Sequence, residues 1–277
     1  MSTNISAKDV KKLRDMTGAG MMDCKKALTE AKGDFDEAVD ILRKKGQKLS
    51  AKRAEREAKE GVVVALVNDS KDKGVVIRLS CETDFVAKNQ EFVNFTEEVA
   101  KLALENQPAD KDALLALPYQ GITVGEAITE QVGKIGEKIE LADYMTLEAP
   151  LVVPYIHFGN RAGVVVGMNK TGEAAAEAGK MVSMQVAAMR PIALDKDNVD
   201  ADVIAKEIEI GKEQARAEGK PEAILEKIAM GKLNKFYQES TLLNQAFISD
   251  QKTSVRNYLK SVDSELTVTG FRHTENG

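Results

Sequence analysis

The chain has 277 residues, of which 43% are apolar and 30% charged, and its net charge is −5. This length and composition are typical of a soluble protein with one large domain plus appendages, or with two to three small domains. No apolar run approaches the roughly 20 residues of a membrane span, and the start "MSTNISAKDVKK" has no apolar signal region, so we expect a cytosolic protein without membrane contact.

Residues 5–45 are predicted to form three short helices. Ser6 is a candidate N-cap for the first helix, "AKDVKKLRDM". The second helix is "DCKKALTEA", with Gly33 as its stop, and Asp34 caps the third, "FDEAVDILRKK", which we expect to end at Gly46. Three helices of this length predict a compact bundle of the ubiquitin-associated (UBA) type, which we assign to residues 1–47.

Two adjacent methionines, Met21 and Met22, follow the break "TGAG" between the first two helices. Neighbouring side chains of a helix cannot both point into the same small core. We therefore expect one of them in the core and one exposed, where a thioether suits an adaptable contact surface.

Residues 43–60 carry eight basic and three acidic side chains, so this segment has a charge of +5 and the remainder −10. Such a run could hold RNA phosphates. The interleaved Glu55, Glu57 and Glu60, and the absence of aromatic residues for base stacking, favour a solvated, charged helical linker, which we assign to residues 48–60.

An α+β pattern of strand, turn, strand and helix follows the linker and occurs twice. Two antiparallel hairpins, each backed by a helix, indicate an internal duplication. We assign the first copy to a subdomain spanning 61–150 and the second to one spanning 151–272. The predicted strands are 61–67, 75–80, 151–158 and 163–169, and the predicted helices are about 89–106 and 173–189.

A helical hairpin is predicted at about residues 197–238, inside the second copy. Its first helix carries Ile204, Ile208, Gly211 and Ala215 on one seam, and its second helix Ile224, Ile228 and Gly231. A narrow seam with polar flanks favours a protruding antiparallel coiled coil, although packing onto the core stays open. A short helix, "TSVRNYLKSV", the strand "LTVTGFR" and a polar tail at 273–277 close the chain.

The junction "CETDFVAKNQ" after the second predicted strand places a charge, Asp84, beside a large apolar ring, Phe85. One interpretation makes Thr83 or Asp84 a local cap and folds the ring back onto the core. The other makes the acid–aromatic pair a contact for a partner. The second copy has only the turn "NKTGE" at this place, so a purely structural junction needs no such pair.

The chain shows no pattern of catalytic residues. Its two histidines, His157 and His273, have no Cys, Asp or Glu at metal-ligand spacing, and no nucleophile-elbow, phosphate-loop or H-E-x-x-H motif occurs. The two cysteines, Cys24 and Cys81, predict neither a disulfide framework nor a thiolate site. We expect no catalytic residue, no metal and no cofactor, and a structural role for His157.

Three segments resemble the signature segments of the bacterial translation elongation factor Ts family. They are "LRDMTGAGMMDCKKALTEAKGD", "CETDFVAK" and "VGKIGEKI", in the family's order and at the expected distances. The resemblance covers nearly the whole chain, to about residue 272. It implies an N-terminal three-helix module, a core of two related subdomains and a helical-hairpin insertion.

The resemblance also implies an activity. It is that of a guanine-nucleotide exchange factor, which binds the GTPase elongation factor Tu with GDP, displaces Mg²⁺ and promotes GDP release so that GTP can rebind. The stretch that intrudes beside the Mg²⁺ site would be Thr83, Asp84, Phe85 and Val86. The N-terminal contact surface would be Arg14, Met21, Met22 and Lys25.

This chain departs from some family members at two places. Gln185 stands where some relatives carry a histidine in the second core helix, and the chain stops soon after "VTGFR", without the further C-terminal helix of longer members. Both departures concern the affinity for the partner rather than the activity.

Three alternatives remain open from the sequence. The N-terminal bundle could be a UBA-type protein-binding adaptor on an unrelated scaffold. Residues 43–60 could bind RNA, although the charge of −10 on the remainder favours a protein without direct nucleic-acid contact. The helical hairpin could contact a second copy, as in a homodimer or a second complex, or the GTPase, or nothing.

Overall fold

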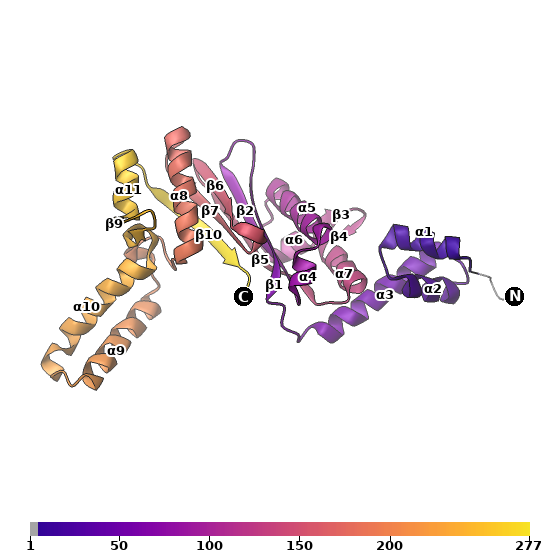
Figure 1. Ribbon diagram of the computed structural model, residues 1–277, viewed down its shortest axis with the longest axis horizontal. Coiled ribbons are helices and arrows are strands. Elements are labelled where there is room, and N and C mark those ends of the chain that lie inside the picture. The colour runs from indigo at the N-terminus through magenta and orange to yellow at the C-terminus, as the bar shows by residue number, and fades with distance from the viewer. Residues whose placement is uncertain (1–4) are drawn as a thin grey trace.

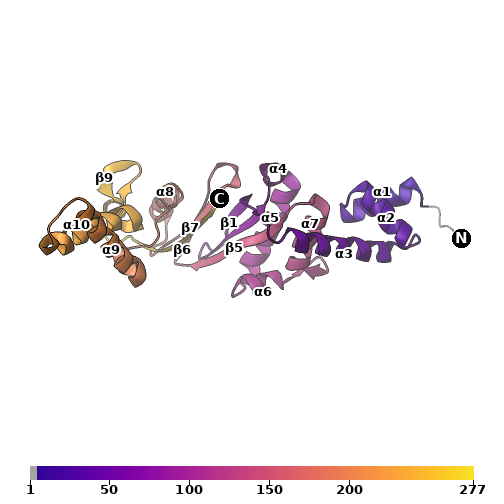
Figure 2. The same cartoon turned by 90° about the horizontal axis from the view of Figure 1, so that it is seen from below.

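The computed structural model describes residues 5–277. A helical module lies at one end of an elongated molecule, two packed sheets with their helices lie in the middle, and a helical hairpin lies at the other end (Figures 1 and 2). The fold is α+β, as predicted.

The N-terminal module consists of α1 (Ala7–Thr17), α2 (Met21–Glu30) and the first half of α3 (Phe35–Arg53). Ser6 caps α1 in a reciprocal capping box with Asp9, and Asp34 caps α3, as the sequence predicts. Helix α2 begins two residues earlier than predicted. The module has its own small core, formed by Val10, Leu13, Ala19, Cys24, Ala27, Leu28, Ala31 and Ala38.

Helix α3 does not end at Gly46, so that prediction was wrong. The helix continues to Arg53 and thereby includes the first part of the predicted linker. A Cβ added at Gly46 would lie only 3.1 Å from the backbone oxygen of Thr129 in α7 (Val124–Ile135). Gly46 therefore allows a close approach between two helices and does not stop the helix.

The first sheet has the antiparallel order β1-β2-β5. One of its two apolar faces packs against α5 and α7, with Val62, Val64, Ile77 and Leu79 buried there. The elements are β1 (Glu60–Val67), β2 (Lys73–Cys81), α4 (Asp84–Ala87), α5 (Gln90–Asn106), α6 (Lys111–Leu115), β3 (Pro118–Tyr119), β4 (Ile122–Thr123), α7 and β5 (Ile139–Glu148).

The second sheet repeats this arrangement with the order β10-β7-β6. In both sheets a hairpin comes first, and the third strand pairs with the hairpin's second strand. The predicted duplication is therefore visible in the topology. The elements are β6 (Leu151–Ile156), η1 (Phe158–Asn160), β7 (Ala162–Met168), α8 (Glu173–Met189) and β10 (Val268–Glu275).

The two sheets pack face to face, so the core has a helix, sheet, sheet, helix order (Figure 1). The alternation along β1 explains this: Val62 and Val64 point toward α5, whereas Val63 and Ala65 point toward the second sheet. Buried residues from both sheets fill the space between them, namely Val63, Ala65, Val76, Leu147, Val152 and Val165.

The helical hairpin consists of α9 (Ala201–Ala217) and α10 (Glu222–Ser240), which extend away from the sheets (Figure 1). Gly211 and Ala215 are buried in its seam, as predicted. On α10 the predicted seam is wrong by one to two residues. Leu225, Ala229 and Leu233 are buried, whereas Ile224 and Gly231 are exposed and Ile228 is half-buried. Gly211 lies directly opposite Ala229, which fixes this register.

The chain then returns to the second sheet. Between α8 and α9 lies η2 (Lys196–Asn198), and after α10 come η3 (Leu242–Asn244), β8 (Ala246–Phe247), β9 (Asp250–Ser254) and α11 (Val255–Val262). Strand β10 is longer than predicted and continues to Glu275, so most of the predicted polar tail pairs with β7. The division into domains at the predicted boundaries stays a prediction.

Candidate protein-interaction site

Thr83, Asp84, Phe85 and Val86, here called the TDFV segment, connect β2 to α5. Thr83 has extended backbone angles at the position before the short helix α4, and Asp84 begins that helix. The N–H groups of Ala87 and Lys88 donate to the carbonyls of Thr83 and Asp84 at 3.3 and 3.0 Å. The segment is thus a single helical turn.

Glu137 holds the start of this turn in place. Its carboxylate accepts hydrogen bonds from the Thr83 hydroxyl at 2.7 Å, from the Thr83 N–H at 3.0 Å and from the Glu82 N–H at 3.1 Å. Gly136 ends α7 with a left-handed φ of 83°, which turns the chain and brings Glu137 to this position. The segments "CETDFVAK" and "VGKIGEKI" are therefore in direct contact.

Glu82 connects the same place to the end of α3. Its carboxylate pairs with Arg53 at 2.6 Å and Arg56 at 3.1 Å and accepts from the Lys138 N–H at 2.6 Å. Burial raises the pKa of the Glu82 carboxyl, but these hydrogen bonds outweigh burial, so the pKa lies below its ordinary value. Glu82 is therefore a charged link between α3, the TDFV segment and the end of α7.

The Phe85 ring is 84% exposed and is not folded back onto the core. Its neighbours Val86 and Ala87 pack partly against the core of the first subdomain. Asp84 pairs with Lys88 at 2.6 Å, and this hydrogen bond lowers the pKa of the Asp84 carboxyl. The turn is thus fixed on one side and presents an apolar ring to solvent on the other, which is unusual unless the ring has a function.

Arg14, Met21, Met22 and Lys25, here called the module surface, are all exposed. Met21 is 56% and Met22 62% exposed, so the expectation that one of them fills the core was wrong. Leu13, Cys24 and Leu28 already fill that core. The module surface and the TDFV segment are not brought together, because α3 and α7 lie between the module and α4 (Figure 1).

A second exposed aromatic ring, Phe158, was not identified from the sequence. It is 92% exposed in η1, at the turn between β6 and β7. The Asn160 side chain donates to the Val63 carbonyl at 3.2 Å and ties this turn to β1. Both η1 and α4 contact β1, and the turn and α4 lie on the same side of the sheets (Figure 2). The signal in the sequence is a Phe next to the turn residues "GN".

The structure also places Gln185 and His157, the two further residues that the sequence analysis discussed. Gln185 is buried and hydrogen-bonded to Gln245, to the Ala246 carbonyl and to the Ile248 N–H. It therefore supports the β8–β9 hairpin and does not lie on a surface.

His157 is exposed at the β6–β7 turn, where its Nδ1 lies 3.1 Å from the Tyr155 hydroxyl.

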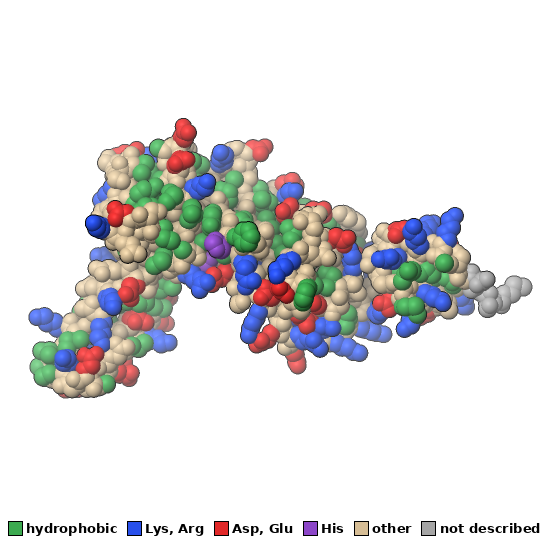
Figure 3. All heavy atoms as spheres, in the orientation of Figure 1, with side chains coloured by type: hydrophobic (Ala, Val, Ile, Leu, Met, Phe, Trp, Pro, Cys, Tyr) green, Lys and Arg blue, Asp and Glu red, His purple; other side chains and the backbone are tan. Residues whose placement is uncertain are grey.

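The basic run at residues 43–60 is largely neutralised. Five of its eight cationic side chains form ion pairs with acidic groups: Arg43, Lys45, Arg53, Arg56 and Lys59. Figure 3 shows Lys and Arg interspersed with Asp and Glu over this part of the surface. An RNA phosphate would have to compete with these carboxylates.

Fold and site together define a class of protein: an α+β protein in which a helical module and a two-sheet core each expose large apolar side chains, Met21 and Met22 on the module and Phe85 on the core. The sequence profile described as "Elongation factor TS" matches residues 82–277. The chain is 53% identical to the elongation factor Ts of Christiangramia forsetii, with 99% of each chain covered. It is 54% identical to that of Amoebophilus asiaticus, with 97% of each covered, and 51% identical to that of Flavobacterium psychrophilum, with 99% of each covered.

This chain therefore belongs to the elongation factor Ts family, and it is a translation elongation factor of protein biosynthesis. Over residues 5–277, none of the helices combines the length and the apolar character needed to cross a membrane.

Proposed function

We propose that this protein is the guanine-nucleotide exchange factor for elongation factor Tu and acts in the cytoplasm. The observation that carries the proposal is the 84% exposed ring of Phe85 on a turn held by Glu137, in a member of the elongation factor Ts family. A fixed, exposed aromatic ring is a typical energetic centre of a protein interface.

Exchange needs no covalent chemistry. A GTPase holds GDP through backbone donors around the phosphates and through a bridging Mg²⁺ ion, so a partner that displaces these ligands weakens GDP binding. The exchange factor has to bind the displaced conformation better than the GDP-bound one. The effect is reciprocal by thermodynamic linkage. If the bound exchange protein weakens the binding of GDP to the GTPase by a given ratio, bound GDP weakens the binding of the exchange protein by the same ratio.

The TDFV segment supplies the differential contact in this proposal. Burial of Phe85 in the GTPase contributes about 1.5–3 kcal/mol, the range for a fully buried large apolar side chain. Asp84 adds a charge near the ligands of the metal, and Thr83 and Val86 keep the turn attached to the core. Because Phe85 is already exposed in the free protein, its burial free energy is gained only in the complex.

The module surface contributes docking rather than exchange. Met21 and Met22 offer adaptable apolar contacts, and Arg14 and Lys25 add exposed positive charge. Phe158 is a further contact for the same GTPase in this proposal, since its turn lies on the same side as α4. The exposed Ile224 and Met230 of α10 make the helical hairpin a candidate contact with a second copy.

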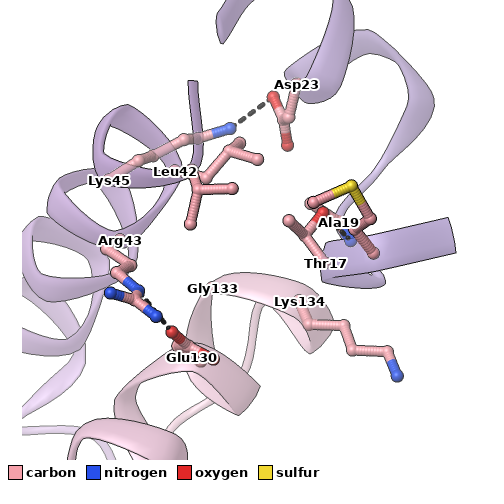
Figure 4. Close-up of a pocket in the computed structure, with 12 residues that line it drawn as sticks. Thr17, Ala19, Asp23, Leu42, Arg43, Lys45, Glu130, Gly133 and Lys134 are labelled. Carbon is pink, nitrogen blue, oxygen red and sulfur yellow. Dashed lines mark hydrogen bonds and ion pairs between the residues drawn. The ribbon is translucent and has the colours of Figure 1, made fainter. Parts of the chain in front are cut away.

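Two alternatives are less favoured. The RNA-binding interpretation is weakened by the ion pairs of residues 43–60. The UBA-type adaptor is weakened because the side of the module formed by Thr17, Ala19 and Leu42 faces α7 across a small pocket (Figure 4).

Release of labelled GDP from purified elongation factor Tu, with and without this protein, tests the proposal. We expect strong acceleration of release and no hydrolysis of GTP by the protein alone. Nucleotide hydrolysis above background, or release at the intrinsic rate, would contradict it.

A further inference from the structure

The N-terminal module meets the core where α3 crosses α7, and each helix has a glycine at the crossing. A Cβ added at Gly133 would lie 3.1 Å from the Cα of Gly46, and one added at Gly46 would lie 3.1 Å from the Thr129 carbonyl oxygen. The atoms in the way belong to the backbone, so they cannot move aside as a flexible side chain can. A side chain at either position would push the two helices apart.

Glycine is an unfavourable choice inside a helix unless the site requires it. Gly46 lies in the interior of α3, and Gly133 lies in the last helical turn of α7, three residues before the cap Gly136. Gly231 offers a matched comparison, because it also lies inside a helix, α10, but a Cβ added there would meet nothing within 4 Å. The close approach is thus not shared by every helical glycine, although Gly211 of α9 makes a similar approach to the backbone of Ala229 inside the helical hairpin.

Other contacts also support the crossing, among them Leu49 of α3, which packs against the core of the first subdomain. Arg43 of α3 pairs with Glu130 of α7 at 2.7 Å (Figure 4). Lys134 extends past Gly18 of the module and pairs with Glu91 of α5 at 2.8 Å. A cavity of about 240 Å³ separates the rest of the module from α7. The closest backbone contact between the module's helix and the core is at the two glycines, so the angle between module and core depends in part on how closely they approach.

Helix α3 also connects the two proposed contact regions. Its first half belongs to the module, and Arg53 at its end pairs with Glu82, the residue directly before the TDFV segment. At 1.5 Å per residue, its 19 residues span about 28 Å. A small change in the angle at which α3 crosses α7 therefore produces a displacement of the module surface relative to Phe85 that grows with distance from the crossing at Gly46.

We propose that Gly46 and Gly133 are positioning residues that hold the module surface at a fixed place relative to the TDFV segment, so that one GTPase can contact both at once. This inference rests on the proposed exchange function. Two contact regions on one rigid body bind more tightly than the same regions at a variable distance, because the second contact forms at a high effective concentration.

The first test measures GDP release against the concentration of the full-length factor. We expect Gly133→Ala to raise the half-saturating concentration and Gly133→Leu to raise it further, by about tenfold, while the saturated rate changes little. Gly231→Ala and Gly231→Leu are the matched controls and should leave both values unchanged. An unchanged half-saturating concentration for Gly133→Leu, or an equal effect of Gly231→Leu, would overturn the proposal.

A coupling measurement separates positioning from loss of stability. If Gly133 acts through the module surface, Gly133→Leu should have a much smaller effect on the half-saturating concentration in a Met22→Ala background. Fully additive effects of the two substitutions would show that Gly133 does not act by positioning that surface.

A distance measurement needs no GTPase and so stands apart from the exchange function. Spin labels on Lys26→Cys in α2 and Lys101→Cys in α5 report the placement of the module, and the native Cys24 and Cys81 are buried. We expect one narrow distance distribution that shifts or broadens in Gly133→Leu and Gly133→Ala but not in Gly231→Leu. A broad distribution in the wild-type protein, or an identical one in the Gly133 variants, would contradict the inference even where exchange is confirmed.

Discussion

Thr83 and Glu137 are joined by two hydrogen bonds, one from the Thr83 hydroxyl at 2.7 Å and one from its backbone N–H at 3.0 Å. A single carboxylate thus connects the residue before α4 to the residue after the end of α7. We expect this link to fix the turn that carries Phe85, together with the packing of Val86 and Ala87 and the hydrogen bond from the Cys81 thiol to the Thr83 carbonyl.

The first prediction concerns this link. Glu137→Ala removes three accepted hydrogen bonds from part-buried donors, and we expect the free energy of unfolding to fall by about 1–2 kcal/mol, the lower part of the range for donors left unpaired. GDP release at saturating factor should slow as well, since the turn loses its fixed position. Glu140→Ala is the control: it removes an ion pair with Lys138, at 3.2 Å, in which the Glu140 carboxylate itself is about half exposed, and should alter stability by less than about 1 kcal/mol. Equal effects of the two variants would argue against the role of Glu137.

The second prediction concerns the link between the two sheets. Asp143 of β5 accepts from Arg78 of β2 and from the Thr274 hydroxyl of β10, both at 2.6 Å. Burial raises the pKa of the Asp143 carboxyl, but the hydrogen bonds from Thr274 and Arg78 outweigh burial, so the pKa lies below its ordinary value of 3.8.

A lowered pKa in the folded state stabilises the fold above pH 3.8, and this stabilisation is lost as the pH falls further through the folded-state pKa. Asp143→Asn should therefore lower the free energy of unfolding at pH 7 by about 1–3 kcal/mol. Urea unfolding at several pH values should show this difference shrinking below pH 3.8. A difference that does not vary with pH would contradict the assignment.

The third prediction concerns Cys81, which lies directly beneath the TDFV segment. Burial, followed by the nearby charge of Glu137, raises the pKa of its thiol to about 12, and its Sγ donates to the Thr83 carbonyl at 3.2 Å. Since only the thiolate reacts rapidly, alkylation of Cys81 at pH 8 should be far slower in the folded protein than in urea. Mass spectrometry after timed labelling checks this, and rapid labelling of the folded protein would show that the turn opens.

The sequence predicts most elements because capping residues and periodicity act locally. Ser6, Asp34 and Asn89 each mark a helix start that the structure contains. Gly46 was misinterpreted because a helical glycine is locally a stop signal, and its partner Gly133 is distant in the sequence. The seam of α10 was misplaced by one to two residues because either of two neighbouring faces provides apolar residues at helical spacing.

The candidate site, like the fold, can be predicted only in part from the sequence. The unusual pair of Asp84 and Phe85 is visible in the sequence, and so is its resemblance to the family. The role of Glu137 is not visible, because it depends on how α7 returns to the end of β2. The exposure of Phe158 and of both Met21 and Met22 depends on which other side chains fill each core, and that is decided only by packing.

The fourth prediction contrasts two phenylalanines in one region. Phe92 is 2% exposed and packs in the core of the first subdomain, whereas Phe85 is 84% exposed. Phe92→Ala should lower the free energy of unfolding by about 3–5 kcal/mol, the range for truncating a buried aromatic side chain. Phe85→Ala should melt within a few degrees of the wild-type protein, and Asp84→Ala likewise. Thermal unfolding of the three variants checks this order.

The central claim is that Phe85 acts in the complex and not in the fold. GDP release from elongation factor Tu at saturating Phe85→Ala tests it most directly, with Asp84→Ala expected to act in the same direction but more weakly. Loss of the ring's burial should reduce the stimulation of release by about tenfold or more, because the lost contact exists only in the GDP-displaced state. A folded Phe85→Ala variant that stimulates release as well as the wild-type protein would contradict the account.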